Sequence, residues 1–128
     1  MISLRQATIL VVDDSPTVQK VVTDMLHQMG VISVDRAANG EEAIAKIKAS
    51  DYTLVISDWN MGPMDGLALL RAVVPRQTPR FNRFIFMTSE RSWGHQTSAR
   101  SEGADDFIAK PFKIETLKAK IEKVLARS

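Results

Sequence analysis

The stretch LVISDWNMGPMDG, residues 54–66, begins as an apolar run and changes character at Asp58. Its first residues are aliphatic and partly β-branched, which is typical of a buried strand. After Asp58 the sequence carries Gly62, Pro63 and Gly66, which are typical of a loop. A strand that ends on a carboxylate holds that group rigidly at the rim of a sheet. Asp58 is therefore the first candidate functional residue.

Composition limits the class of protein. The chain has 128 residues, 45% of them hydrophobic, which suits one domain over residues 1–128. Its formal net charge of +2 is too small to indicate nucleic acid or membrane binding. The absence of cysteine excludes disulfides and thiolate metal sites. The apolar run near the N-terminus is too short for a signal peptide or a membrane span, so we expect a soluble cytoplasmic protein.

Strand-like and helical segments alternate along the chain. The predicted strands are residues 7–12, 31–37, 52–57, 81–88 and 105–109. The predicted helices are residues 16–29, 40–50, 65–74, 91–102 and 113–128, of which the fourth is polar and contains Gly94. Ser15 and Asn39 are the expected N-caps of the first two helices, and Gly30 should end the first. This alternation predicts an α/β fold with a doubly wound, five-stranded parallel sheet and five helices.

Polar side chains occur at the expected ends of four strands. Asp13 and Asp14 close the first strand, Asp58 the third and Thr88 the fourth, and Lys110 follows the fifth. Ligands of doubly wound sheets bind at the carboxyl ends of the strands, so we expect these groups to converge. Three carboxylates repel one another unless a cation lies among them, and an all-oxygen set favours Mg²⁺. A lysine and a hydroxyl nearby suit a phosphoryl group, which a carboxylate can accept as nucleophile.

The motifs VVDDS, VISDWNMGPMDG, FMTSE and AKPF, in this order, make the chain similar to CheY-like response regulator receiver domains. The resemblance covers nearly the whole chain and implies the flavodoxin-like fold of that family. It implies a two-component phosphorelay in which a sensor histidine kinase or a histidine phosphotransfer protein passes a phosphoryl group to Asp58. The protein would be a switch that promotes its own phosphorylation and dephosphorylation, not an enzyme with an external substrate.

The resemblance also gives roles to the residues that match the motifs. Thr88 and Lys110 would contact the phosphoryl oxygens. The Mg²⁺ ligands would be Asp13, Asp14, Asp58 and the backbone carbonyl of Asn60, with Asp14 favoured as the direct ligand of the acidic pair. The tuning and switch positions would be Asn60 and Glu90, which adjust hydrolysis of the aspartyl phosphate, Phe107, the switch aromatic, and Ser89, which leaves room for its movement.

The expected mechanism has two states. Phosphorylation of Asp58 would draw Thr88 toward the phosphoryl oxygens and free space that Phe107 then fills. The surface formed by the fourth helix, fifth strand and fifth helix would change with it. We expect no output domain after residue 128, so the signal would pass to a protein target that the sequence does not identify. A monomer and a phosphorylation-dependent dimer both fit.

Some features leave alternatives open. Gly62 and Pro63 shift the rigid position of the loop by one residue relative to the family, and the fourth helix is unusually polar. A pseudo-receiver that binds partners without being phosphorylated would fit both departures. A phosphatase of the haloacid-dehalogenase type also uses a strand-end Asp with Mg²⁺, although it normally needs a longer chain and a cap. Taken singly, Lys110 reads as a solvated lysine and Thr88 as an ordinary strand residue.

Overall fold

The computed structural model describes residues 2–59, 66–73, 83–88 and 103–126. Its strands are β1 (Thr8–Val12), β2 (Ser33–Ala37), β3 (Leu54–Asp58), β4 (Arg83–Thr88) and β5 (Asp106–Ala109). The helices within these ranges are α1 (Pro16–Gln28), α2 (Gly40–Ala49), α3 (Gly66–Val73) and α5 (Ile114–Leu125). The helix predicted over residues 91–102 lies outside the described residues. None of the described helices is long and apolar enough to cross a membrane.

The five strands form one sheet in the order β2-β1-β3-β4-β5, and every neighbouring pair is parallel. The chain moves from β1 to β2 on one side and then returns to β3 on the other side of β1. This reversal is the doubly wound topology that the sequence predicted. Strand β2 is at the edge and β1 lies inside the sheet, in agreement with the more polar sequence of the former and the continuous apolar run of the latter.

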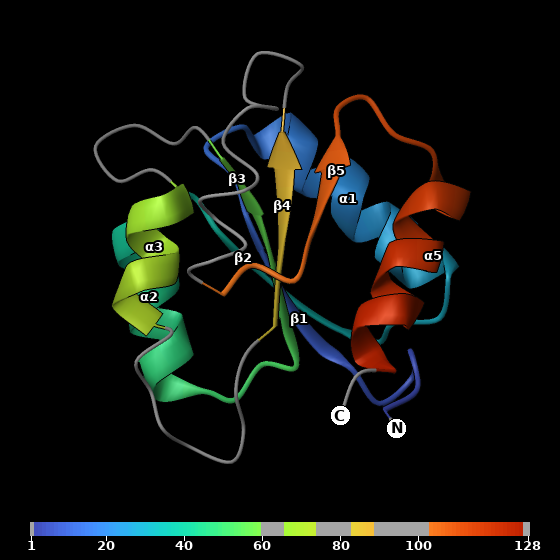
Figure 1. Ribbon diagram of the computed structural model, residues 1–128, viewed down its shortest axis with the longest axis horizontal. Helices are drawn as coiled ribbons and strands as arrows, with labels where there is room; N and C mark the ends of the chain where they lie inside the picture. Colours follow the sequence, from blue (N-terminus) through green and yellow to red (C-terminus); the bar gives the residue numbers. More distant parts are fainter. Residues whose placement is uncertain (1, 60–65, 74–82, 89–102, 127–128) are drawn as a thin grey trace.

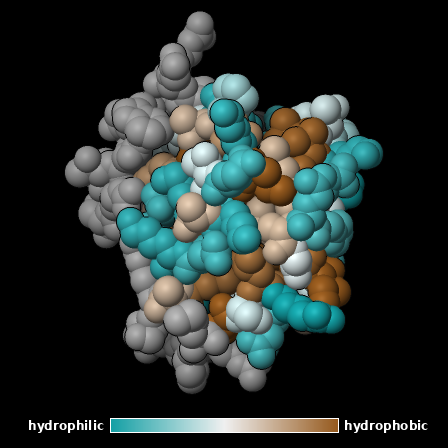
Figure 2. Space-filling view, turned by 90° about the vertical axis from the view of Figure 1, so that its right-hand side faces the viewer, coloured by the Kyte–Doolittle hydropathy of each residue, from teal (hydrophilic) through white to brown (hydrophobic). Residues whose placement is uncertain are grey.

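Helices cover both faces of the sheet, as Figure 1 shows: α2 and α3 lie on one side, α1 and α5 on the other. Successive strand residues point to opposite faces, so each strand contributes to two separate apolar layers. Leu10, Val55 and Phe86 belong to the layer that contains α3 residues. Ile9 and Ile56 belong to the layer that contains α1 and α5 residues. Seen from the side of α5, apolar side chains are visible between polar ones (Figure 2).

Helix α1 begins just after the acidic pair in the sequence, and its N-cap is Ser15, as predicted. Ser15 Oγ accepts a hydrogen bond from the backbone N–H of Val18 at 3.3 Å. Pro16 is the first helical residue, where its missing N–H leaves no hydrogen bond unmade. The helix ends before Gly30, whose φ of 107° is a conformation that favours glycine. The N-cap predicted at Asn39 is also confirmed, since its Oδ1 accepts from the N–H of Glu42 at 2.8 Å.

Element boundaries differ from the predictions by a few residues, most informatively in β3. The strand begins at Leu54, two residues after the predicted start, and includes Asp58 as its last residue. Tyr52 is buried outside the strand, and its hydroxyl donates to Asp35 Oδ2 at 2.6 Å. Asp58 is in register with Met87 of β4. The carboxylate is therefore carried by a residue within the β-ladder, which restrains it more firmly than a loop position would.

Candidate functional site

Three carboxylates meet at the carboxyl end of the sheet, the end toward which the strand arrows point in Figure 1. Asp13 and Asp14 follow β1, and Asp58 ends the neighbouring strand β3. One carboxylate oxygen from each lies within 4.8 Å of the other two. Asp13 is 1% exposed, Asp58 is partly buried and Asp14 is exposed to solvent. The convergence expected from strand order is therefore present for all three acids.

Lys110 lies between two of these carboxylates. Its Nζ is 3.1 Å from Asp13 Oδ2 and 3.2 Å from Asp58 Oδ1. Its backbone N–H donates to the carbonyl of Thr88 at 2.8 Å, which holds the start of the loop after β5 against the end of β4. Burial lowers the pKa of Lys110, but the charges of Asp58 and Asp13 more than offset this, and the net pKa is raised. The side chain is therefore an ammonium group at neutral pH.

Thr88 ends β4 one residue beyond Met87, the register partner of Asp58. Its hydroxyl is buried and has no hydrogen-bond partner among the described residues. A buried polar group left unpaired is unfavourable by roughly 1–3 kcal/mol, and such groups are uncommon in folded proteins. An oxygen-bearing ligand at this end of the sheet would satisfy the hydroxyl. The unpaired atom therefore supports a ligand site here.

The backbone around Asp13 is held by a network that the sequence did not predict. The N–H of Ser15 donates to Asp13 Oδ1 at 2.9 Å, and the N–H of Asp13 donates to the carbonyl of Ala37 at 3.1 Å. The side-chain amide of Gln19 donates to the carbonyl of Asp13 at 2.6 Å. Gln19 lies four residues after the cap Ser15, so both face the same side of the helix, but this spacing does not indicate which carbonyl groups its amide reaches.

Aromatic rings pack directly behind Asp58. The indole of Trp59 makes an edge-to-face contact with Phe86, with ring centroids 5.1 Å apart. Phe107, the predicted switch aromatic, is 2% exposed, and its ring centroid lies 5.8 Å from that of Phe86 and 6.4 Å from that of Trp59. The phenyl ring thus occupies an interior position in this structure. The aromatic cluster links the chain next to Asp58 with β5.

Gly66 lies where α3 begins and approaches the same cluster. Its backbone N–H donates to the carbonyl of Trp59 at 2.8 Å. A Cβ at this position would be 2.7 Å from the ring of Phe86 and 2.9 Å from the carbonyl oxygen of Asp58. Only glycine therefore fits here without displacement of the backbone that carries the acid. Asn60, Gly62, Pro63, Ser89 and Glu90 lie outside the described residues.

The donor set fits a hard divalent cation. All three converging groups are carboxylates, and carboxylate oxygens are preferred ligands of Mg²⁺, which also retains water molecules. The adjacent ammonium of Lys110 and hydroxyl of Thr88 are hydrogen-bond donors of the kind that phosphoryl oxygens accept. The carboxyl end of the sheet thus combines a cation site with donors for an anionic group.

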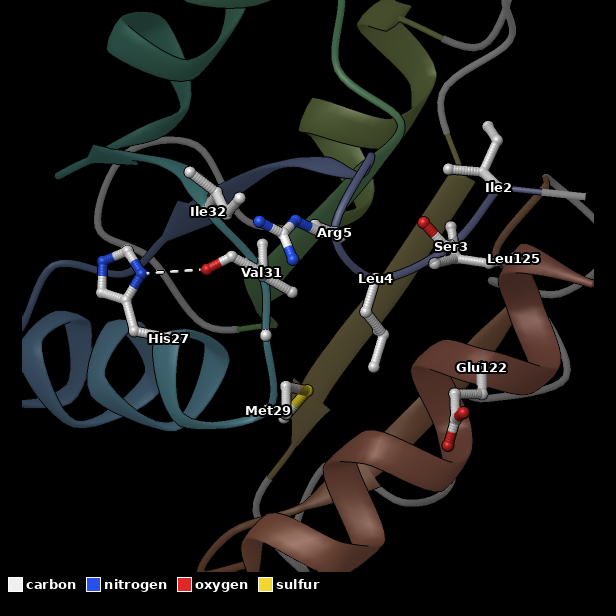
Figure 3. A pocket seen from close by; sticks show the side chains of 11 residues that line it. Ile2, Ser3, Leu4, Arg5, His27, Met29, Val31, Ile32, Glu122 and Leu125 are labelled. Atoms are coloured by element: carbon white, nitrogen blue, oxygen red, sulfur yellow. Dashed lines mark hydrogen bonds between the residues drawn. The ribbon is translucent and has the colours of Figure 1, made fainter.

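A hollow of about 840 Å³ lies at the other end of the sheet, and Figure 3 shows the side chains that line it. Apolar residues that precede β1 and β2, among them Leu4 and Ile32, form much of its wall. His27 lies beside it, with Nδ1 3.0 Å from the carbonyl of Val31. The hollow contains none of the predicted site residues. The converging carboxylates and Lys110 therefore lie away from this hollow, at the carboxyl end of the sheet.

Sequence comparisons relate the chain to known proteins. The family described as "Response regulator receiver domain" matches residues 9–122. The chemotaxis protein CheY of Pseudomonas aeruginosa is 30% identical over 119 residues, covering 93% of this chain and 96% of the relative. A probable chemotaxis protein CheY of Rhizobium etli is 36% identical over 116 residues, covering 91% of this chain and 90% of the relative.

Solved structures show the same likeness in three dimensions. The chemotaxis response regulator CheY4 of Vibrio cholerae superposes with a TM-score of 0.83 at 33% identity, covering 92% of this chain and 98% of that one. The receiver domain of NtrX from Brucella abortus superposes with a TM-score of 0.85 at 30% identity, covering 94% and 99%. The fold therefore has counterparts among solved proteins.

Proposed function

Because this chain belongs to the response regulator receiver domains of two-component systems, we propose that Asp58 is its phosphoacceptor. In the proposed reaction an Asp58 carboxylate oxygen bonds to phosphorus as the P–N bond of a phosphohistidine breaks, and the imidazole leaves with the electron pair. The phosphohistidine would belong to a sensor kinase or a phosphotransfer protein. The observation that carries the proposal is the Lys110 ammonium between Asp13 and Asp58, at the same end of the sheet as the unpaired Thr88 hydroxyl.

Each residue has a separate task in this proposal. The β-ladder fixes the backbone of Asp58 and the contact with Lys110 restrains its carboxylate, so little freedom is lost on reaction. The Lys110 ammonium, 3.2 Å from Asp58 Oδ1, would form charge-assisted hydrogen bonds to the transferred phosphoryl oxygens. The Thr88 hydroxyl would donate to another of them. These donors stabilise the negative charge that the phosphoryl group brings into the site.

Mg²⁺ fits the same site. Its proposed ligands are Asp13, Asp14, Asp58 and the backbone carbonyl of Asn60, which suits a cation that needs a few protein oxygens. When bound, it would neutralise charge on the acids and on the phosphoryl oxygens. Asp14 is the proposed direct ligand of the acidic pair because its side chain is exposed, whereas Asp13 is buried and paired with Lys110.

The proposed output is a change on the surface of the fourth helix, β5 and α5. Phe107 is a β5 residue whose ring contacts the cluster behind Asp58, so it joins the site to this surface. Asp106, the neighbour of Phe107, forms an ion pair with Lys120 of α5 at 3.2 Å. A shift of β5 would therefore be transmitted to α5 and to a protein target bound there.

Intact mass spectrometry after incubation with Mg²⁺ and acetyl phosphate tests the proposal. The wild-type protein should gain one phosphoryl group, and Asp58→Asn should gain none. A sample without Mg²⁺ should also stay unmodified. Asp24→Asn is the matched control, because Asp24 is an exposed helical acid that pairs with Lys20, and it should react like wild type.

If a folded wild-type protein stays unmodified with acetyl phosphate and with a histidine kinase, and does not bind beryllofluoride as a phosphoryl mimic, Asp58 is not a phosphoacceptor. A receiver fold that serves only as an interaction module would then explain the chain. Turnover of an external phosphoester would instead support a phosphatase.

A further inference from the structure

Gln19 bridges the ends of two neighbouring strands at the proposed cation site. Its Nε2 is 2.6 Å from the carbonyl oxygen of Asp13 and 3.4 Å from that of Ala37. A primary amide nitrogen carries two hydrogens, so it can donate to both carbonyls at once. Ala37 is the last residue of β2, and Asp13 directly follows β1. Gln19 therefore links β1 and β2 at the point where their backbone pairing ends.

The backbone of Gln19 is itself held in place within α1. The backbone N–H of Gln19 donates to the carbonyl of Ser15 at 3.0 Å, and its carbonyl accepts from the Thr23 hydroxyl at 2.7 Å. Ser15 in turn donates its N–H to the Asp13 carboxylate. Asp13 is thus restrained from two directions: Ser15 holds its carboxylate and Gln19 holds its carbonyl.

The carbonyl that Gln19 holds belongs to the peptide unit between Asp13 and Asp14. Peptide units are planar, so fixing the carbonyl oxygen also fixes the N–H of Asp14 and its Cα, the atom that carries the side chain. The Asp14 side chain is exposed, and its carboxylate accepts no hydrogen bond from the described part of the chain. Its position therefore depends on the backbone behind it.

We propose that Gln19 is a positioning residue that orients Asp14 for cation binding through the Asp13–Asp14 peptide. The inference rests on the proposed function in one respect, namely that these acids bind Mg²⁺. Residues that orient the ligands of a metal without binding it themselves typically alter metal affinity about 10–100-fold when they are removed. Gln19 contacts the backbone and not a ligand atom, so we expect an effect at the lower end of that range.

The test compares Gln19→Met with Thr23→Val by calorimetric titration of the full chain with Mg²⁺. Methionine keeps the length of the side chain and removes both donors. Thr23→Val removes the hydroxyl that bonds to the Gln19 carbonyl, so it loosens the same part of α1 but leaves the amide donors intact. We expect a roughly 10-fold increase in the Mg²⁺ dissociation constant for Gln19→Met and little change for Thr23→Val.

A second readout separates positioning from general damage. The rate of phosphorylation by acetyl phosphate is measured against Mg²⁺ concentration. The positioning role predicts that Gln19→Met needs roughly 10-fold more Mg²⁺ for half the maximal rate and then recovers the wild-type maximum. A variant that is merely damaged would be phosphorylated more slowly than wild type even at saturating Mg²⁺.

A wild-type measurement covers the case in which Gln19→Met does not fold. In nuclear magnetic resonance spectra, the side-chain amide protons of Gln19 should shift on addition of Mg²⁺ with the calorimetric midpoint. Those of Gln28, exposed at the end of the same helix, should not shift. No shift for Gln19 would overturn the inference.

The outcomes distinguish this inference from the proposed function. Equal Mg²⁺ affinity in wild type and Gln19→Met overturns the role of Gln19 and leaves the phosphoacceptor proposal intact. Equal weakening in Gln19→Met and Thr23→Val also overturns it, because helix stability would then be the cause. Absence of Mg²⁺ binding by the wild-type protein overturns both.

Discussion

The two ends of the parallel sheet are built from opposite kinds of residue. At the carboxyl end, Asp13, Asp58 and Lys110 form a compact charged group that is partly buried. At the amino end, a hollow of about 840 Å³ has a mainly apolar wall that includes Leu4 and Ile32. The residues that line this hollow include Arg5 and Glu122 but none of the three converging carboxylates. Convergence of charged groups, not the size of a cavity, therefore identifies the site in this fold.

Chain direction explains why the charges gather at one end. In a parallel sheet with helical crossovers, the helices that follow the strands begin at the carboxyl end, where their N-termini carry partial positive charge. Helix α1 begins at Pro16, directly after the acidic pair, and α3 begins at Gly66 after β3. Carboxylates at the strand ends therefore lie near the helix ends that favour negative charge.

The largest difference in stability between the two ends of the sheet is expected when one glycine at each end is replaced by alanine. Gly66→Ala places a Cβ 2.7 Å from the Phe86 ring and 2.9 Å from the Asp58 carbonyl, so we expect a loss of about 3 kcal/mol in unfolding free energy. Gly30→Ala at the amino end meets no atom within 4 Å, although its φ of 107° disfavours alanine. We expect Gly30→Ala to lose about 1–2 kcal/mol of unfolding free energy. Urea denaturation measures both, and equal losses would contradict the close packing at Gly66.

Removal of the ammonium group should strengthen cation binding at the carboxyl end. Lys110 pairs with two proposed Mg²⁺ ligands, so in Lys110→Met the carboxylates repel one another without compensation. We expect the Mg²⁺ dissociation constant to fall roughly 5-fold, while phosphorylation by acetyl phosphate slows because a phosphoryl contact is lost. Calorimetry and mass spectrometry measure the two effects. Lys123→Met on exposed α5 is the control, and weaker Mg²⁺ binding in Lys110→Met would contradict the competition.

A buried tyrosine away from the charged cluster should control stability at alkaline pH. Burial, the hydrogen bond to Asp35 and the charge of Asp35 raise the pKa of Tyr52 from 10.0 to about 12. A pKa raised in the folded state means that this contribution to stability is complete below pH 10.0 and is lost as the pH rises toward about 12.

Tyr52→Phe tests this linkage. It removes one buried hydrogen bond, so we expect it to lower the unfolding free energy by about 1 kcal/mol at neutral pH. The difference from wild type should shrink between pH 10.0 and about 12. Lys110, whose pKa is also raised, titrates in both proteins and cancels in the comparison. Urea denaturation along a pH series is the measurement, and a constant difference across that range would show that Tyr52 does not titrate there.

The smallest effect is expected at the hollow. Ile32 is 60% exposed, so Ile32→Ser should change the unfolding free energy by less than about 0.5 kcal/mol. Mg²⁺ affinity and phosphorylation should equal those of wild type, because the residue precedes β2 at the far end of the sheet. A change in either would show that the two ends are coupled.

Features with a local signature could be predicted from the sequence. The strands appear as apolar runs, Ser15 and Asn39 as cap residues, and the acids as groups at strand ends. The position of the acids relative to one another followed from the order of βα units, because parallel strand ends share one edge. The site could therefore be anticipated as a set of residues, although not as a set of distances.

Features that depend on contacts between distant parts of the chain could not be predicted. The Gln19 amide reaches Ala37, and the Tyr52 hydroxyl reaches Asp35 across the sheet. Gly66 looked like an ordinary loop glycine, since its need for a missing Cβ arises only from the Phe86 ring and the Asp58 carbonyl. The predicted start of β2 at Val31 was two residues early, because that buried residue donates its N–H to the carbonyl of Leu26 instead of to a strand.

The hydrogen bond from Gly66 to Trp59 has a consequence for how such a protein can diversify. It joins Trp59 and Gly66, the two residues that flank the segment 60–65, and Trp59 directly follows the acid. Substitutions between these two residues leave the hydrogen bond in place, because both of its partners lie outside the segment. The Gly62-Pro63 order of this chain is one such variation. Descendants and engineered versions can therefore differ within this segment and still inherit the hydrogen bond that holds the chain beside Asp58.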